Sequence, residues 1–231
     1  PSAGEIAMMD PDKCLKIHQE VFGNAEGFQF FVVGNVLADS IQPLLEKYLG
    51  SLPVQSRGTV ISDAGLRPIQ GLNELKFYRG AEPKSMILEK YYGAGTFDKD
   101  FGFYANLVGQ VMNIKIIEEL REKIGGIYSG GIQVEVKKEP YSHFSAILFL
   151  PCGPESVDTL LKAAHIELAR LRREGPTEKD LEKVKKATLE SYRESVKTNG
   201  YWIGALAEIT RHPEKAQEYL DVEARINAVT T

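Results

Sequence analysis

The feature that most constrains the fold of this chain is the order in which two hydrophobic periodicities alternate along it. Apolar residues at helical spacing predict helices over 11–22, 38–49, 98–122, 156–173 and 177–197, followed by short helices to the end. Short apolar or alternating runs predict strands over 27–35, 74–79, 85–92, 127–136 and 142–150. The chain therefore contains both kinds of element in a mixed order.

Most of the predicted strands come in adjacent pairs. Gly80-Ala81-Glu82-Pro83 separates the runs 74–79 and 85–92, and the letters KKEP separate 127–136 from 142–150. Two strands joined by so short a loop form an antiparallel hairpin. We therefore predict an α+β fold with a mainly antiparallel sheet and helices packed on one face. Residues 1–231 are interpreted as a single domain, with a boundary near Pro68 as the weaker alternative.

Charge and hydropathy exclude some classes of protein. The formal net charge is −4, which argues against a protein that binds a nucleic-acid phosphate backbone. No apolar run is as long as the roughly 18 residues that a membrane-spanning helix requires. The first residues, PSAGEIAMMDPDK, have neither an initiator methionine nor the features of a signal peptide. We therefore expect the chain to be a piece of a longer protein.

No metal site is predicted from the histidines and cysteines. The four histidines are far apart in the sequence, at positions 18, 143, 165 and 212, and neither H-E-x-x-H nor H-x-x-E-H occurs. Cys14 and His18 are four residues apart and could share a helical face, but no third ligand is visible. A buried cysteine beside a boundary histidine is the favoured interpretation. Cys14 and Cys152 could pair, although two small buried hydrophobic residues are the favoured interpretation.

Two further patterns are assigned structural roles. The run YYGAGTF (91–97) follows a strand and precedes a helix, but it lacks the third glycine of a dinucleotide-binding loop. The basic residues Lys183–Lys186 and Arg193 alternate with acidic residues, which is typical of a solvent-exposed helix face. We expect a turn at the first and no nucleic-acid site at the second.

The segment LREKIGGIYSGG (120–131) is the one candidate functional site. A long amphipathic helix is predicted to end around Arg121, Gly125-Gly126 allow the chain to reverse, and Tyr128 begins the next strand. A guanidinium and a phenol that converge there could hold peptide carbonyls or a developing oxyanion. The structural alternative is that Arg121 complements the helix dipole and Tyr128 packs at a strand start, and the residues alone favour it.

This segment resembles the second-half signature of the pitrilysin/insulinase family of zinc metallopeptidases, in which an Arg and a Tyr seven residues apart follow a long helix. The segments FFVVGNVLADSIQPLLEKYLGSLP (30–53) and LARLRREGPTEKDLEKVKKATLESYRESVKTNGYWIGAL (168–206) are similar to its opening and closing parts. Tyr91-Tyr92-Gly93 looks like the bacterial branch of these proteases. The resemblance covers residues 10 to 229.

The resemblance implies paired homologous α+β domains that enclose a chamber. In the family the N-terminal half holds zinc through H-x-x-E-H and a distant Glu, and the C-terminal half contributes the Arg and the Tyr to substrate binding. Because this chain has no zinc motif, we expect it to be the non-catalytic C-terminal half. Zinc is then expected on the missing N-terminal half and none on this chain. Arg121 and Tyr128 would contact the substrate backbone or support the tetrahedral intermediate.

The expected partners are a peptide substrate and the zinc-binding half, either of the same protein or of a partner subunit. The resemblance suggests the periplasm, with the cytoplasm as an alternative. Two other functions stay open. One is an inactive scaffold or assembly module of the same fold, and the other is an unrelated α+β peptide-binding protein.

Overall fold

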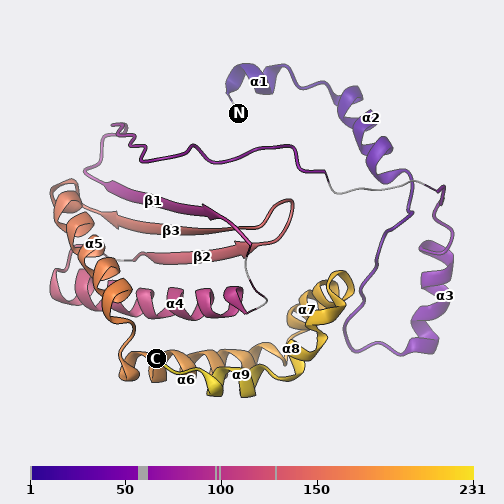
Figure 1. The fold of residues 1–231 in the computed structure, drawn as a ribbon. Coiled ribbons are helices and arrows are strands. Elements are labelled where there is room, and N and C mark those ends of the chain that lie inside the picture. The colour runs from indigo at the N-terminus through magenta and orange to yellow at the C-terminus, as the bar shows by residue number, and fades with distance from the viewer. Residues whose placement is uncertain (1, 57–61, 97, 99, 128) are drawn as a thin grey trace. The chain divides into compact units, whose positions relative to one another are not determined.

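The computed structural model describes residues 2–56, 62–96, 98, 100–127 and 129–231. Its α-helices are α1 (Ala3–Ala7), α2 (Pro11–Phe22), α3 (Ala38–Tyr48), α4 (Phe101–Ile116), α5 (Val157–Glu174), α6 (Glu178–Ser195), α7 (Asn199–Arg211), α8 (Ala216–Leu220) and α9 (Val222–Ala228). A π-helix, η1 (Ile117–Lys123), continues α4, and two 3₁₀ turns are η2 (Pro154–Ser156) and η3 (Pro213–Lys215). The strands are β1 (Ser85–Ala94), β2 (Gly131–Lys137) and β3 (His143–Cys152) (Figure 1).

The chain divides into two compact units. One comprises Pro1–Val60 with Arg193–Leu220, and the other comprises Ile61–Tyr192 with Asp221–Thr231. The second unit contains the sheet, the helices α4 and α5 and the candidate site. No helix in the described parts of the chain is both long and apolar enough to cross a membrane.

The sheet has the order β1-β3-β2, and both pairings are antiparallel. Leu88 of β1 faces Phe149 of β3, and Gln133 of β2 faces Ile147. The α+β architecture with an antiparallel sheet confirms the predicted fold class. The β2–β3 pair is the hairpin predicted across KKEP.

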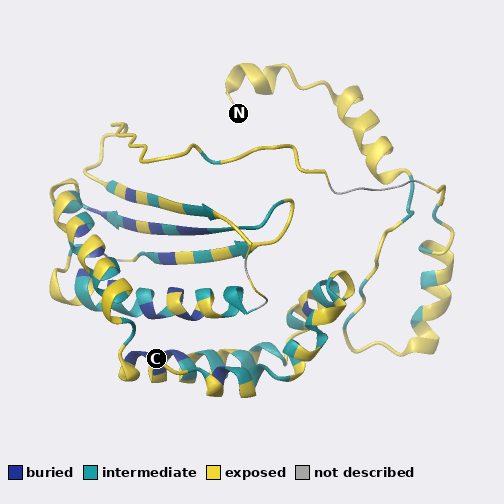
Figure 2. Cartoon of the chain, in the orientation of Figure 1, coloured by how far each residue is buried: buried dark blue, intermediate teal, exposed yellow. Residues whose placement is uncertain are grey.

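One face of the sheet is buried under α4 and α5. The largest hydrophobic cluster draws on all three strands, α4, α5, η1 and the turn after η1, and Figure 2 colours buried positions on these elements dark blue. Its members are Ile87, Ile116, Leu120, Ile127, Ile132, Ala146, Leu148, Leu150, Cys152, Leu160 and Ala164. The opposite face carries exposed side chains such as Met86 and Leu88. This one-sided burial is what the alternating strand pattern predicts.

Helix starts agree well with the sequence. Asp10 caps α2 by accepting hydrogen bonds from the backbone of Asp12 and Lys13, with Pro11 in the first turn. Asp98 accepts from Phe101 N at 2.7 Å at the start of α4. Thr177 Oγ1 accepts from Asp180 N at 3.2 Å at the start of α6. Each cap and its helix are neighbours in sequence, so local residue types suffice to predict them.

Two strand predictions are wrong. Residues 27–35 form no strand in the structure, and Phe28, Phe30 and Val32 are each at least 40% exposed. Residues 74–79 are likewise unpaired and exposed, and β1 pairs with β3 instead of forming a hairpin with them. A strand needs hydrogen bonds from a neighbour as well as β-rich residues, and within the described residues neither segment has that neighbour.

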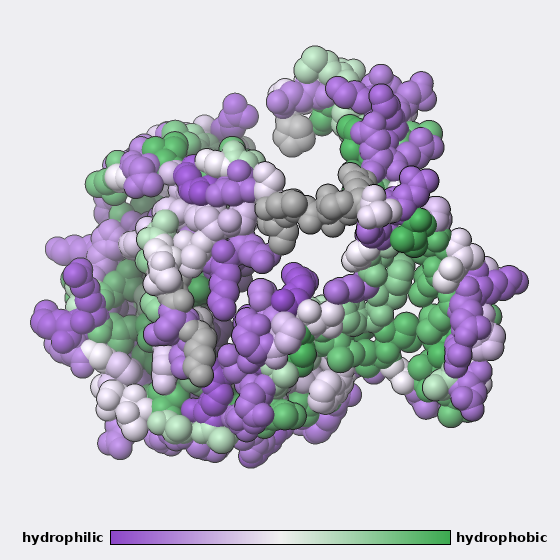
Figure 3. Space-filling view, turned by 45° about the vertical axis from the view of Figure 1, so that its right-hand side comes forward, coloured by the Kyte–Doolittle hydropathy of each residue, from purple (hydrophilic) through white to green (hydrophobic). Residues whose placement is uncertain are grey.

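In the first unit, hydrogen bonds join the segment that follows α2 to the segment that follows α3. Asn24 Nδ2 donates to Gln55 O at 2.6 Å, and Gln55 N donates back to Asn24 Oδ1 at 2.9 Å. A chain of aromatic contacts then joins Phe22, Phe28 and Phe30, with ring centroids 6.3 and 6.2 Å apart. Figure 3 shows hydrophobic side chains at the surface around α3 and the segment that precedes it.

Candidate functional site

The candidate site begins where α4 changes into the π-helix η1. The wider turn is visible in the backbone, because Ile124 N donates to Glu119 O, five residues earlier, at 3.2 Å. Arg121 lies in the last turn of η1, and its side chain is exposed. π-helical turns recur at functional sites, where they change the direction in which a side chain projects. Arg121 is therefore presented to solvent at an irregular helix end.

Two glycines close this helix end, as the sequence predicts. Gly125 has φ +70°, a left-handed conformation that favours glycine, and Gly126 N donates to Leu120 O at 3.1 Å. Gly126 is needed for a second reason. A Cβ at this position would lie 2.8 Å from Leu160 Cδ2, and Leu160 is fully buried. The turn is therefore packed directly against α5.

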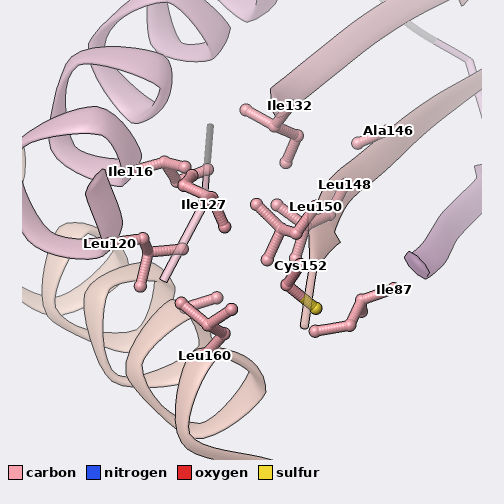
Figure 4. Packing of buried hydrophobic residues seen from close by; sticks show 11 residues of the cluster. Ile87, Ile116, Leu120, Ile127, Ile132, Ala146, Leu148, Leu150, Cys152 and Leu160 are labelled. Atoms are coloured by element: carbon pink, nitrogen blue, oxygen red, sulfur yellow. The ribbon is translucent and has the colours of Figure 1, made fainter. Parts of the chain in front are cut away.

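After the glycines the chain passes into the core. Ile127 forms an isolated antiparallel bridge with Cys152 at the end of β3 and is 5% exposed. Figure 4 shows its side chain among those of Leu120, Leu148 and Leu160. Buried anchors thus flank the short turn on both sides. Tyr128 lies outside the described residues, so its convergence with Arg121 stays a prediction.

An ionic network around the buried Asp180 fixes the same helix end to α6. Lys115 Nζ lies 2.8 Å from Asp180 Oδ2 and 3.0 Å from Glu118 Oε2, and Lys183 Nζ lies 2.9 Å from Glu118 Oε1. Thr177 Oγ1 also donates to Asp180 Oδ2 at 2.5 Å. Asp180 is only 2% exposed. A buried carboxylate needs such partners, because an unpaired buried charge is strongly destabilising.

The network shifts the pKa values of both carboxyl groups downward. Burial alone would raise the pKa of Asp180, but hydrogen bonds from Lys115 and Thr177 outweigh it and hold that pKa below its usual range. Hydrogen bonds from Lys183 and then Lys115 lower the pKa of Glu118 despite some burial. Both acids therefore stay ionised at neutral pH and keep the end of α4 in place.

Sequence reasoning missed this network. The alternating charges of α6 predict a solvent-exposed face, but Lys183 and Lys185 are used in tertiary contacts; Lys185 Nζ donates to Asn227 O and Val229 O at 3.0 and 3.1 Å. The available signal was Thr177-x-x-Asp180, a helix-start motif. That motif marks the cap, but it does not reveal that Lys115, far away in sequence, completes the site.

The turn predicted over 91–97 is wrong for its first part, because residues 91–94 pair with β3 and belong to β1; the glycine there still has a structural role. Gly93 lies in β1 opposite Phe144 of β3. A Cβ there would be 2.3 Å from Phe144 Cε1, so the ring occupies the space that any side chain would need. Phe97, at the end of the run, lies outside the described residues.

Comparison with known proteins gives the family. The family model described as "Peptidase M16 inactive domain" matches residues 9–188. The chain belongs to this family. The match confirms the resemblance to the pitrilysin/insulinase-type zinc proteases, and it removes the alternative of an unrelated α+β peptide-binding protein.

Curated M16 relatives are zinc proteases by name. The chain is 22% identical over 214 residues to a "Zinc protease PQQL-like" protein of Arabidopsis thaliana, covering 86% of this chain and 22% of that protein. It is 23% identical over 182 residues to the "Probable zinc protease PqqL" of Escherichia coli strain K12, covering 77% and 19%. The chain thus spans about a fifth of the length of these relatives.

Solved structures show the same fold. The periplasmic protease PqqL from Escherichia coli superposes with a TM-score of 0.68 at 17% identity, over 86% of this chain and 22% of that one. A mutant of the ferredoxin protease FusC, solved in complex with Arabidopsis ferredoxin, gives 0.63 at 15% identity, over 92% and 23%. At these identities the likeness establishes the M16 fold alone.

The described residues of this M16 inactive domain do not present a zinc site. Within the described parts of the chain, no group of three or more His, Cys, Asp or Glu side chains is placed to hold a metal. Cys14 is exposed on α2, and the His18 ring lies beside Phe22 with centroids 5.0 Å apart. Both cysteines are free thiols, and Cys152 is buried as predicted, whereas the expected burial of Cys14 is wrong because α2 buries no residue.

Proposed function

We propose that this chain is a non-catalytic domain that forms part of the substrate chamber of a zinc-dependent endopeptidase. The observation that carries the proposal is the placement of Arg121 on η1. Its guanidinium is exposed, while the backbone that holds it is fixed by Gly126 against Leu160 and by the Lys115–Asp180 pair. A donor group on a rigid support suits the binding of peptide carbonyls or of a developing oxyanion.

The catalytic zinc belongs, in this proposal, to another part of the assembly. The missing N-terminal half of the same protein, or a partner subunit, would hold it, and this chain would act as the C-terminal half. Support comes from the family match to an inactive domain and from relatives named zinc proteases. The periplasm is the proposed compartment, because PqqL from Escherichia coli, which shares this fold, is a periplasmic protease.

Arg121 and Tyr128 are the residues we propose to contact substrate. They would support the scissile carbonyl from the side of the chamber opposite the metal. Arg121 supplies fixed donors, and Tyr128 would add a phenolic donor. The role of Tyr128 rests only on the family resemblance and on its position in the sequence after Gly125-Gly126.

The alternative is an inactive scaffold or assembly module of the same fold. The two functions differ in what accompanies this chain. An H-x-x-E-H motif upstream of Pro1, or in a partner chain, favours the peptidase; a parent protein and partners without that motif favour the scaffold.

The test is reconstitution with the zinc-binding half. The chain alone should neither bind zinc tightly nor cleave a fluorogenic peptide, and the combined halves should cleave it in a chelator-sensitive way. Arg121→Ala and Tyr128→Phe should each lower kcat/KM by about ten-fold or more. Lys123→Ala is the matched control, because Lys123 is an exposed cation in the same turn that pairs with Glu119. Unchanged hydrolysis in both test variants would remove the assigned roles.

A further inference from the structure

A cavity of about 300 Å³ lies between α4 and α5 over the covered face of the sheet. The buried side chains of Ile132 and Ala146 belong to the strands beneath it. Val108 and Met112 line it from α4, and Leu168 and Leu171 line it from α5. Its remaining lining residues are Tyr91 and Arg172. An apolar interior with a few polar groups at one side is typical of a small-ligand pocket.

A second, wider hollow of about 670 Å³ adjoins this cavity. The two share Tyr91, Leu168 and Arg172, and the hollow adds His165 and Arg173. Together they form one groove whose inner part is apolar and whose outer part combines the apolar Leu168 and Ala169 with the side chains of His165, Arg172 and Arg173. Val108, although apolar, is 46% exposed at the groove.

Glu89 is an acidic residue hydrogen-bonded to two residues that line this groove. Both oxygens of Glu89 lie 2.9 Å from His165 Nε2, and Tyr91 Oη donates to Glu89 Oε2 at 2.8 Å. Burial, and then the hydrogen bond and charge of Glu89, raise the pKa of Tyr91, so its hydroxyl keeps the proton that it donates. Glu89 is thus engaged by His165 and Tyr91, and within the described residues it forms no ion pair with Arg172 or Arg173.

The two arginines of the groove differ in their partners. Arg173 donates to Glu174 Oε1 at 2.5 Å. For Arg172 the described residues supply neither a hydrogen-bond acceptor nor an ion-pair partner, although it lines both the cavity and the hollow. A guanidinium in this setting complements a carboxylate, which it can bind with two parallel hydrogen bonds.

We propose that the groove binds the C-terminal residue of a peptide, with its apolar side chain in the cavity and its α-carboxylate on Arg172. A terminal Leu or Phe joins these two chemistries within one residue, as the adjacent apolar and basic parts require. An internal acidic residue carries the carboxylate without the apolar group. The inference goes beyond the proposed function, because it needs neither Arg121 nor a zinc-binding partner.

The experiment is a titration of the ¹⁵N-labelled 231-residue chain followed by NMR. The probe is the pentapeptide Gly-Ser-Gly-Ser-Leu with a free C-terminal carboxylate, compared with its C-terminal amide. We expect saturable shifts of the Val108, Ala146 and Leu168 amide signals with the acid and at least about ten-fold weaker binding of the amide. Octanoate serves as a carboxylate with an apolar chain but no peptide.

Variants test separately the contact of the carboxylate with Arg172 and the binding of the apolar side chain in the cavity. Arg172→Gln should weaken binding of the acid about ten-fold, and Arg173→Gln, in the same turn, should change it less than about two-fold. Val108→Trp should block the cavity without a buried substitution, and the melting temperature checks that each variant folds. Any of four results would overturn the proposal. They are equal binding of the acid and the amide, unchanged binding by Arg172→Gln, binding of octanoate but not of the peptide acid, and the absence of any saturable shift.

Discussion

The side-chain amide of Asn113 on α4 is hydrogen-bonded twice to the backbone of Ile132 on β2. Nδ2 donates to Ile132 O at 2.8 Å, and Ile132 N donates to Oδ1 at 2.6 Å. β2 is an edge strand of the described sheet, and Ile132 is 4% exposed. Asn113 thus takes the place of a neighbouring strand for two buried backbone groups. Gly131 makes the approach possible, since a Cβ there would be 2.4 Å from Asn113 Oδ1.

Removing this amide should destabilise the fold. Asn113→Leu keeps a similar volume but leaves the N–H and C=O of Ile132 without partners, and we expect a loss of about 2 kcal/mol in the free energy of unfolding. Urea denaturation measures it. The control is Asn106→Leu on the same helix, where the side chain only accepts from Gln110 at the surface and the expected change is below about 0.5 kcal/mol. Equal losses in the two variants would contradict the role of Asn113.

This contact also shows where prediction from sequence stops. Helices α2 and α6 could be predicted because Asp10 and Thr177 stand beside the helices that they cap. Strand partners are not local. The pairing of β1 with β3, in preference to residues 74–79, depends on tertiary packing that residue types in one segment do not specify.

The candidate site was predictable to a similar extent. The position of Arg121 at a helix end and the reversal at Gly125-Gly126 follow from local residue types, and the family resemblance singled out Arg121 and Tyr128. The π-helical turn and the pairing of Lys115 with Asp180 were not predicted. The pairing joins residues on different helices, and a π turn differs from an α turn by backbone hydrogen bonds that the same residues can make either way.

The close approach of Gly126 to α5 predicts a second stability effect. Gly126→Ala would place its Cβ 2.8 Å from Cδ2 and 3.1 Å from Cγ of the buried Leu160, so α5 or the turn must move. We expect a loss of about 1–3 kcal/mol, as for other overpacked cores. Thermal or urea unfolding measures it.

Gly204→Ala provides the matched control. Gly204 lies within α7, and nothing stands within 4 Å of its added Cβ. Alanine is favoured over glycine inside a helix, so this variant should gain about 0.5–1 kcal/mol. A neutral Gly126→Ala would mean that the turn is not packed as described.

The Lys115–Asp180 pair predicts how stability depends on pH. The pKa of Asp180 is lower in the folded chain than in the unfolded chain, because the bonds from Lys115 and Thr177 outweigh the effect of burial. As pH falls below the usual carboxyl range of about 4, the unfolded chain binds a proton before the folded chain does. The stabilisation is therefore present at neutral pH and is lost in acid.

Asp180→Asn should accordingly be less stable than the parent chain at pH 7 and should lose less stability between about pH 5 and pH 2. Urea unfolding at several pH values gives both quantities. The control is Glu190→Gln, which removes an exposed carboxylate on the same helix. It should leave the dependence of the unfolding free energy on pH almost unchanged. If Asp180→Asn lost as much unfolding free energy in acid as the parent chain does, other carboxylates would set the pH dependence.

The two thiols offer a probe of the candidate site itself. Cys14 is exposed, whereas Cys152 is 8% exposed, and burial together with the charge of Glu155 raises the pKa of the Cys152 thiol. Because the thiolate is the reactive form, Cys14 should react with Ellman's reagent at least about 100-fold faster than Cys152. Cys14→Ser should remove the fast phase, and two fast thiols would contradict the burial of Cys152.

The slow reaction of Cys152 should also report on the Gly125-Gly126 turn. The backbone of Cys152 forms a β-bridge with Ile127, directly after that turn, so the thiol should become accessible when the turn opens. Gly126→Ala, if it strains the packing on Leu160, should therefore accelerate the slow phase and leave the fast phase unchanged.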